Sequence, residues 1–382
     1  MYLPFPIETY RQRIARLRVL MDDAGIEGLV VTQPDAIFWL CGFDTIGYLW
    51  PQALIIDIGE SDPRLVTRTT EGPSAHASSW ISDLHLYDIA KETPAERIAA
   101  GVADRGLSRA VLGIDMGAFT LVPSVWTALR EALPEATFVD AGLLIADARL
   151  TKEPAELAYQ RQAAAIADYA MATVQDAIEP GMSEGELAGV ASLALGEAGS
   201  EYAAIPPMVV SGERTALVHA LAGHRSVARG DLVCVELAGV VARYHAVVMR
   251  TFSVGPMSPR VAEVSDCLSE AMLAAIESAV PGTRAPVPDA RCNAVLERLD
   301  LVRRRCHRIG YSLGIAYPPG WLEPMTLVEG DDHVLAPGMS FTIEPNLSLA
   351  DEGFGLKLGE TVACVESGSE RWSKLEPRTV EV

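Results

Sequence analysis

The chain has 382 residues, 49% of them hydrophobic, and its 51 acidic and 31 basic residues give a net charge of −20. This length favours two domains, and this charge disfavours nucleic acids and anionic membranes as partners. No apolar run reaches the roughly 18 residues of a membrane span, the N-terminus lacks a signal-peptide pattern, and the six cysteines form no CxxC pair. We therefore expect a cytoplasmic protein with reduced thiols, whose partner is a small molecule or another protein.

The first 150 residues alternate helical and strand patterns. Apolar side chains over 7–25 form one stripe that stops at a glycine, which predicts an amphipathic helix. Apolar runs and a further amphipathic stretch predict three strands and a second helix, over 28–32, 52–59 and 109–117, and over 122–136. This succession predicts a small α/β domain over residues 1–150.

The pattern changes near residue 150, where an Ala-rich stretch over 151–178 predicts one long helix with an N-terminal capping signal. Beyond it, helical patterns cover 185–199, 260–280 and 289–305, and β patterns cover 206–211, 232–254, 339–349 and 355–365. Strands grouped toward the end among separate helices predict an α+β domain over residues 151–382.

Four stretches of this second domain place polar side chains in apolar strand or turn contexts. They are "SGERTALVHALAGHRSVARGD" with His219, "VELAGVVARYHAVVMRTF" with Glu236 and His245, "RIGYSLGIAYPPGW" with Tyr311 and Tyr317, and "PGMSFTIEPNL" with Glu344. A single histidine or glutamate in such a context is more often structural than functional. Their order and spacing taken together carry more information than any one of them.

This ordered set resembles the pita-bread fold family, the M24 peptidase-like group of methionine aminopeptidases, prolidases, aminopeptidases P and metal-free creatinases. The motifs "SGERT…H…RGDLV", "RTF", "GYSLG", "LAPGMSFTIEP" and "GETVACV" follow the family's order, and residues 1–150 resemble the creatinase and prolidase N-terminal domain. The resemblance implies an α/β N-terminal domain over 1–150 and an α+β pita-bread catalytic domain over 151–382.

The resemblance also says where a metal site would lie. In metal-dependent relatives, two aspartates, one histidine and two glutamates hold two divalent ions, and these positions fall on Glu236, Val247, Pro318, Glu344 and Gly359. Valine, proline and glycine side chains offer no donor atom. We therefore expect no metal and no other cofactor, as in the creatinase branch, which hydrolyses a C–N bond of a guanidinium compound without metal.

Creatine itself fits poorly, because Trp50 and Val328 replace the two arginines that hold its carboxylate in creatinase, and Met249 replaces a pocket glutamate. The nearer resemblance is to the ectoine hydrolases, through "ELAG…RYH…RT" and "RIGYS.G..YPP.W". It implies hydrolytic opening of a cyclic amidinium that carries one carboxylate. A creatinase, a metal-dependent Xaa-Pro dipeptidase of the prolidase type and a non-catalytic small-molecule-binding homologue are the alternatives.

The resemblance assigns the catalytic roles to three residues. Glu236 would attack the amidinium carbon or balance its charge, His219 would act as general acid and base, and Glu344 would orient the amidinium or the histidine. The substrate-binding side chains would be Trp50, Tyr48, His245, Tyr311 and Tyr317.

Two further expectations concern the histidines and the quaternary structure. His245 would bind the substrate carboxylate or satisfy a neighbouring carbonyl, and the remaining histidines, His307 among them, are expected at the surface or in helices. Relatives in the creatinase branch are dimers in which one N-terminal domain covers the partner's pocket. The resemblance thus implies a homodimer with a shared active site, in which Tyr48 and Trp50 act in trans on a small zwitterionic substrate.

Overall fold

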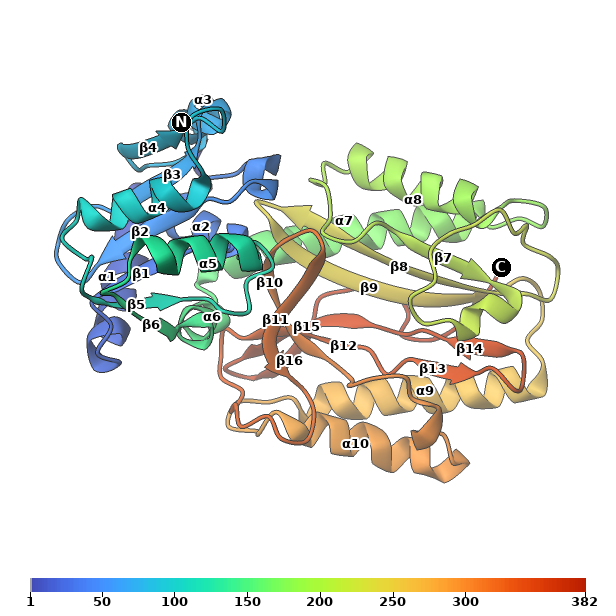
Figure 1. Ribbon diagram of the computed structural model, residues 1–382. Helices are drawn as coiled ribbons and strands as arrows, with labels where there is room; N and C mark the ends of the chain where they lie inside the picture. Colours follow the sequence, from blue (N-terminus) through green and yellow to red (C-terminus); the bar gives the residue numbers. More distant parts are fainter. Residues whose placement is uncertain (1) are drawn as a thin grey trace. The chain divides into compact units, whose positions relative to one another are not determined.

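A computed structural model describes residues 2–382 and divides the chain into two compact units, Met1–Arg149 and Leu150–Val382 (Figure 1). The expected combination of an α/β domain and an α+β domain is confirmed. In this range, none of the helices combines the length and the apolar character that crossing a membrane would require.

The N-terminal unit is built around a six-stranded mixed sheet in the order β4-β3-β2-β1-β5-β6. β1 pairs antiparallel with β2 and parallel with β5. The strands are β1 (Gly28–Val31), β2 (Ala53–Asp57), β3 (Arg64–Arg68), β4 (Asp83–Tyr87), β5 (Val111–Ile114) and β6 (Thr137–Asp140). The helices are α1 (Ile7–Asp23), α2 (Pro34–Cys41), α3 (Gly72–Ser78), α4 (Pro94–Ala103), α5 (Pro123–Ala132) and α6 (Gly142–Leu150).

The C-terminal unit contains a nine-stranded sheet in the order β16-β15-β12-β10-β9-β8-β7, with β11 paired to β10 and β17 to β9. Its strands are β7 (Met208–Ser211), β8 (Leu232–Val241), β9 (Tyr244–Ser253), β10 (Tyr311–Tyr317), β11 (Gly320–Thr326), β12 (Ser340–Ile343), β15 (Glu360–Val365), β16 (Gly368–Arg371) and β17 (Val380–Glu381). A separate two-stranded ladder joins β13 (Leu347–Leu349) and β14 (Phe354–Leu356).

Helices cover this large sheet on two sides. They are α7 (Pro154–Ala177) and α8 (Glu184–Glu197) beside β8 and β9, and α9 (Pro259–Ser278) and α10 (Pro286–Leu296) on the side of β12 and β16 (Figure 1). The Ala-rich sequence of α7 lets it approach the sheet closely, because a Cβ atom added at Gly239 of β8 would lie 2.1 Å from the carbonyl oxygen of Ala163. Small residues on both elements thus fix the position of β8.

The hairpin of β8 and β9 turns through two residues, Ala242 and Arg243, with φ angles of 48° and 63°. This left-handed pair is the geometry of a tight two-residue hairpin turn. The carboxylate of Glu201 accepts both of their backbone N–H groups, at 2.9 Å each. The resulting register sets Glu236 opposite Met249 and therefore decides which side chains share one face.

Two segments differ from the sequence-based expectation. The helix expected over 289–305 ends at Leu296, because Asp300 adopts a left-handed φ of 53° and two 3-10 turns, η4 (Glu297–Leu299) and η5 (Val302–Arg304), follow. The Gly-, Tyr- and Pro-rich stretch over 308–321, for which no element was predicted, supplies the buried strand β10 and the start of β11. Gly314 within β10 weakens the strand pattern in the sequence.

Candidate active site

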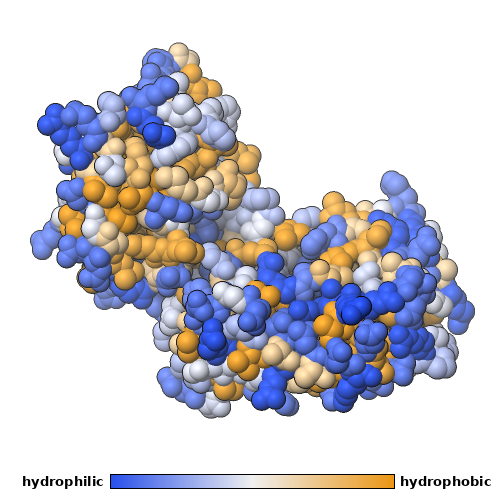
Figure 2. All heavy atoms as spheres, turned by 60° about the horizontal axis from the view of Figure 1, so that its bottom comes forward, coloured by the Kyte–Doolittle hydropathy of each residue, from blue (hydrophilic) through white to orange (hydrophobic). Residues whose placement is uncertain are grey.

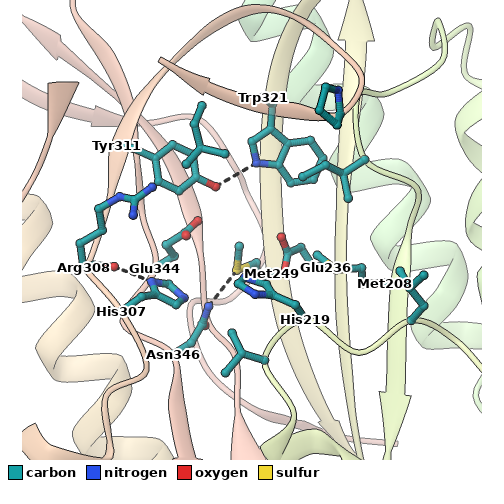
Figure 3. Close-up of a pocket in the computed structure, with 15 residues that line it drawn as sticks. Met208, His219, Glu236, Met249, His307, Arg308, Tyr311, Trp321, Glu344 and Asn346 are labelled. Atoms are coloured by element: carbon teal, nitrogen blue, oxygen red, sulfur yellow. Dashed lines mark hydrogen bonds between the residues drawn. The ribbon is translucent and has the colours of Figure 1, made fainter. Parts of the chain in front are cut away.

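A cavity of about 410 Å³ lies in the C-terminal unit (Figure 3). Its wall brings together four of the residues singled out from the sequence, namely His219, Glu236, Tyr311 and Glu344. The other polar side chains of the wall are His307, Arg308 and Asn346, and the largest apolar ones are Met249 and Trp321. The pocket therefore combines ionisable groups with an apolar and aromatic lining, which is the usual composition of a small-molecule site.

Neighbouring strands explain how residues far apart in the chain meet here. Glu236 lies within β8, Tyr311 begins β10, and Glu344 directly follows β12. These strands are near neighbours in the sheet order. His219 comes from the segment after the 3-10 turn η3 (Gly212–Ala216), whose start is held by Glu184, an acceptor for the backbone N–H of Ser211 at 2.7 Å.

Glu236 forms a buried ion pair with a residue that the sequence reasoning missed. The Nζ atom of Lys357 donates to Glu236 Oε2 at 2.9 Å and to the carbonyl oxygen of Val218 at 2.5 Å. The two side chains are only 4% and 7% exposed. Oε1 of Glu236 forms no hydrogen bond within the described part of the chain. One oxygen is thus anchored and the other is left for a ligand.

Glu344 is in a different electrostatic environment. Burial, followed by the charge of nearby Glu236, raises its pKa well above the ordinary value, and the opposing effects of Thr342, Tyr311 and Lys357 do not offset this. Its Oε2 atom is buried and has no hydrogen-bond partner within residues 2–382. The two neighbouring glutamates thus lie in different environments, one paired with a lysine and the other buried with an unpartnered oxygen, an asymmetry typical of carboxyl pairs that do acid–base work.

Two aromatic side chains form a wall beside the glutamates (Figure 3). The indole Nε1 of Trp321 donates to the Tyr311 hydroxyl at 2.9 Å. Burial, together with the nearby carboxylates, raises the pKa of Tyr311 well above its ordinary value, so the phenol stays protonated. Trp321 is 1% exposed. Apart from the aromatic side chain itself, nothing in the surrounding sequence "PPGWLEP" indicates that this residue lines a pocket.

His219 and His307 lie side by side, with ring centroids 6.3 Å apart and ring planes 10° from parallel. His307, expected at the surface or in a helix, is half-buried in the pocket wall. Its Nδ1 lies 2.6 Å from the carbonyl oxygen of Arg308, which makes Nδ1 the protonated nitrogen of the neutral ring. Burial lowers the pKa of His307, whereas His219 is exposed and forms no hydrogen bond among the described residues.

The five positions that hold metal ligands in metal-dependent relatives do not form a donor set in this chain. Val247 and Met249 belong to a buried apolar cluster with Tyr311 and Trp321. A Cβ atom added at Gly359 would lie 2.8 Å from Cγ and 2.9 Å from Sδ of Met249, so the methionine fills the space of a side chain at that position.

Pro318 is outside the pocket wall, and the phenol of Tyr311 and the indole of Trp321, from the same segment, lie beside the glutamates instead. Within residues 2–382, no three His, Cys, Asp or Glu side chains gather as metal donors. Two divalent ions would need several oxygen or nitrogen donors each. The residues present therefore do not fit the dinuclear centre that the fold implies.

Two predicted substrate-binding residues lie elsewhere. His245 is fully buried, accepts the backbone N–H of Ala204 at Nε2 (3.0 Å) and donates from Nδ1 to the carbonyl oxygen of Arg243 (2.9 Å). Burial lowers its pKa to about 3, so it stays neutral. Of its two expected roles, the structure supports the carbonyl contact. Tyr317 is buried beneath the guanidinium of Arg243, 4.6 Å from its ring centroid, and is likewise absent from the pocket wall.

Tyr48 and Trp50 belong to the N-terminal unit. Tyr48 is buried against the ring of Phe119. Trp50 is 42% exposed, and the guanidinium carbon of Arg68 lies 4.9 Å from the centroid of its ring. Apolar side chains gather on the visible face of this unit, at the left of Figure 2. Exposed apolar residues also flank Trp50 in the chain, at Ile46 and Leu49. The indole is therefore accessible, and its action on a partner's pocket remains a prediction.

Sequence reasoning missed Lys357, His307 and Arg308, although one signal for Lys357 was present. It is the only charge in the apolar run "FGLKL", and a charge buried in such a run needs a partner of opposite sign. His307 and Arg308 followed a basic, polar segment with no periodicity, which is typical of a surface loop.

Comparisons with known proteins identify the family of both units. Residues 158–366 match metallopeptidase family M24, and residues 13–151 match the creatinase/prolidase N-terminal domain. An ectoine hydrolase of Halomonas elongata is 29% identical over 393 residues, covering 96% of each chain. An Xaa-Pro dipeptidase of Pyrococcus furiosus is 26% identical over 372 residues, covering 96% of this chain and 99% of its own.

Among solved structures, a recombinant prolidase from Thermococcus sibiricus superposes with a TM-score of 0.89 at 24% identity, over 98% of this chain and 99% of its own. At that identity the likeness concerns the fold alone. The pita-bread architecture expected from the sequence is thereby confirmed.

Proposed function

The chain belongs to metallopeptidase family M24, and we propose that within this family it hydrolyses, without metal, a C–N bond in a small amidinium zwitterion of the ectoine type. The observation that carries the proposal is the carboxyl pair of Glu236 and Glu344. One member pairs with Lys357, the other is buried with a raised pKa, and valine, proline and glycine stand at three of the five positions that hold metal ligands in metal-dependent relatives. The similarity to an ectoine hydrolase over nearly the whole chain supports this substrate class.

The pocket has groups suited to a planar cation. An amidinium ion is attracted by the Glu236 carboxylate and by the faces of Tyr311 and Trp321. Its positive charge also stabilises the ionised form of Glu344, whose Oε2 atom has no partner among the described residues. Binding of the cation is therefore coupled to release of the Glu344 proton. A neutral Xaa-Pro peptide bond would gain nothing from this pair without a metal to polarise its carbonyl.

The reaction adds one water molecule and breaks one ring C–N bond. The free oxygen of Glu236 attacks the amidinium carbon, or it stabilises the charge while a water attacks. The imidazole of His219 gives a proton to the leaving nitrogen and recovers one from the water that completes the hydrolysis. The product is a single open-chain molecule that carries a secondary amide at one end of the former ring bond and a free amine at the other. The exposed position of His219 at the pocket wall allows this exchange with solvent.

The proposal is tested by incubating the purified protein separately with ectoine, creatine and an Xaa-Pro dipeptide and identifying the products by mass spectrometry. We expect opening of the ectoine ring and no cleavage of the other two. Cleavage of the dipeptide would identify a prolidase, and binding of ectoine without turnover would identify a binding protein.

The role of Glu236 is tested by Glu236→Gln, which retains the shape of the side chain but neither attacks nor balances a cation. We expect ectoine turnover to be lost while the fold persists, and Glu236→Asp, which withdraws the carboxylate by one methylene, to be impaired. Rapidly quenched wild-type protein is then digested and searched for a substrate-sized adduct on the peptide containing Glu236. Wild-type turnover in Glu236→Gln would remove this residue from the mechanism.

A further inference from the structure

The wall of the pocket contains a guanidinium that the reaction does not use. Arg308 lies directly before the segment that leads into β10, and its side chain runs beside Tyr311, across the pocket from Glu236 (Figure 3). Within residues 2–382 it forms no ion pair with a carboxylate. Lys357, the other cation at this site, is already paired with Glu236. Arg308 is therefore the cation of the pocket whose charge remains to be balanced.

The surroundings of Arg308 hold it in place without satisfying it. Its guanidinium carbon is 5.2 Å from the centroid of the Tyr311 ring, a cation–π contact. Its backbone is fixed by the hydrogen bond between its carbonyl oxygen and Nδ1 of His307. Its Nε atom is buried and has no hydrogen-bond partner in the described part of the chain. A buried donor without a partner is costly unless a ligand completes it.

From this geometry we infer that Arg308 binds the carboxylate of the substrate. A guanidinium offers donors in a planar fork that matches the two oxygens of a carboxylate. The pocket then has a cation-binding side at Glu236 and Glu344 and an anion-binding side at Arg308. This arrangement suits a small ring that carries a cationic and an anionic group, and it assigns to Arg308 the role expected from the sequence for His245.

The inference rests on the proposed function for the identity of the substrate, and it makes a separate statement about recognition. Hydrolysis needs the amidinium carbon near Glu236, whereas Arg308 determines how strongly a ring with a carboxylate is preferred over one without. Loss of Arg308 should thus lower kcat/KM for ectoine and leave kcat/KM almost unchanged for an analogue whose carboxylate is replaced by a neutral group.

The test compares kcat/KM for ectoine and for its primary carboxamide, which keeps the amidinium ring and replaces the carboxylate by a neutral group. Wild-type protein should prefer ectoine by about 10- to 100-fold, the range expected for a hydrogen bond to a charged group. In Arg308→Gln this preference should collapse, mainly through a higher KM for ectoine. Arg308→Lys, which keeps the charge but not the fork, should be intermediate.

Arg303→Gln is the matched control, because Arg303 is an exposed arginine nearby in the chain and its replacement changes the net charge equally. It should leave both substrates unaffected. A wild-type protein that uses ectoine and the carboxamide equally well would overturn the inference, and this measurement needs no variant that could fail to fold. An unchanged preference in folded Arg308→Gln would also overturn it.

Calorimetric binding of ectoine and the carboxamide to wild type and Arg308→Gln separates this inference from the proposed function. If binding depends on the carboxylate and on Arg308 but neither compound is hydrolysed, the proposed hydrolysis is rejected and the anion site at Arg308 is retained. If ectoine and the carboxamide are hydrolysed equally well, the proposed hydrolysis is retained and the anion site is rejected.

Discussion

The ammonium of Lys357 joins Glu236 to the carbonyl oxygen of Val218, the residue that precedes His219. One buried cation therefore holds the proposed reacting carboxylate and the segment that carries the proposed acid–base histidine. Because a buried charge is costly unless it is paired, the same contact also gives the buried Lys357 ammonium a partner of opposite charge.

Replacing Lys357 by methionine should damage both stability and turnover. It leaves the buried Glu236 carboxylate unpaired, which typically lowers the free energy of unfolding by about 3–5 kcal/mol. Denaturant unfolding and ectoine kinetics measure the two effects. Lys374→Met, at an exposed lysine of the same unit, is the control and should change neither. A Lys357→Met protein as stable and active as wild type would show that the ion pair has no role.

Glu344 should make stability depend on pH. Its folded-state pKa is raised, so the folded protein retains a proton that the unfolded chain loses as the pH rises above about 4.3. The unfolding free energy of wild type should therefore fall, relative to Glu344→Gln, between pH 5 and pH 8. Chemical denaturation at both pH values measures this difference. Glu366→Gln, at an exposed glutamate, is the control, and its unfolding free energy should change between the two pH values as that of wild type does. If the unfolding free energy of Glu344→Gln also changed with pH as that of wild type does, the raised pKa of Glu344 would be contradicted.

The two stacked histidines should respond differently to replacement. His219→Asn should lower kcat by about 10²- to 10⁴-fold, the range for losing a general acid–base group. His307→Asn should mainly raise KM, because Nδ1 of His307 fixes the backbone of Arg308. Steady-state kinetics with ectoine separates the two effects, with His224→Asn as the control outside the pocket wall. Near-normal kcat in His219→Asn would transfer the acid–base role to another group, with His307 the first to examine.

Most of the architecture could be predicted because its elements follow simple patterns. The apolar stripe of α1 ends at Gly25, and the small residues of α7 match Gly239 on the strand that it covers. β10 could not be predicted, since Gly314 within it and the Pro-Pro-Gly sequence that follows it are typical of a loop. It becomes a strand because β9 and β12 offer backbone partners on either side.

The candidate site was only partly predictable from the sequence. The motifs indicated Glu236, Glu344, His219 and Tyr311, and the structure brings these four to one pocket. Lys357 pairs with a residue 121 positions away, and this partnership depends on strand order, which no local pattern encodes. His245 looked functional because it lies close to Glu236 in the sequence. Its side chain nevertheless turns toward backbone groups of Ala204 and Arg243 rather than toward the cavity.

Trp50 should act on the pocket of a partner subunit if the protein is a homodimer. Its indole is accessible and suits a planar cation, so Trp50→Ala should raise KM for ectoine. The discriminating experiment mixes inactive His219→Asn subunits with Trp50→Ala subunits. Recovery of activity in verified heterodimers is expected, because one of the two pockets then combines an intact His219 with an intact Trp50. No recovery would place Trp50 on its own subunit's pocket or outside the site.

The measurement that tests the central claim most directly is ectoine turnover by metal-depleted protein. The protein is treated with a strong chelator, its Mn, Co and Zn contents are measured, and kcat is determined before and after these ions are returned. We predict no stoichiometric metal and an unchanged kcat, because Val247, Gly359 and Met249 leave no donor set for a dinuclear centre. Loss of turnover on chelation, restored by Mn or Co, would contradict the account.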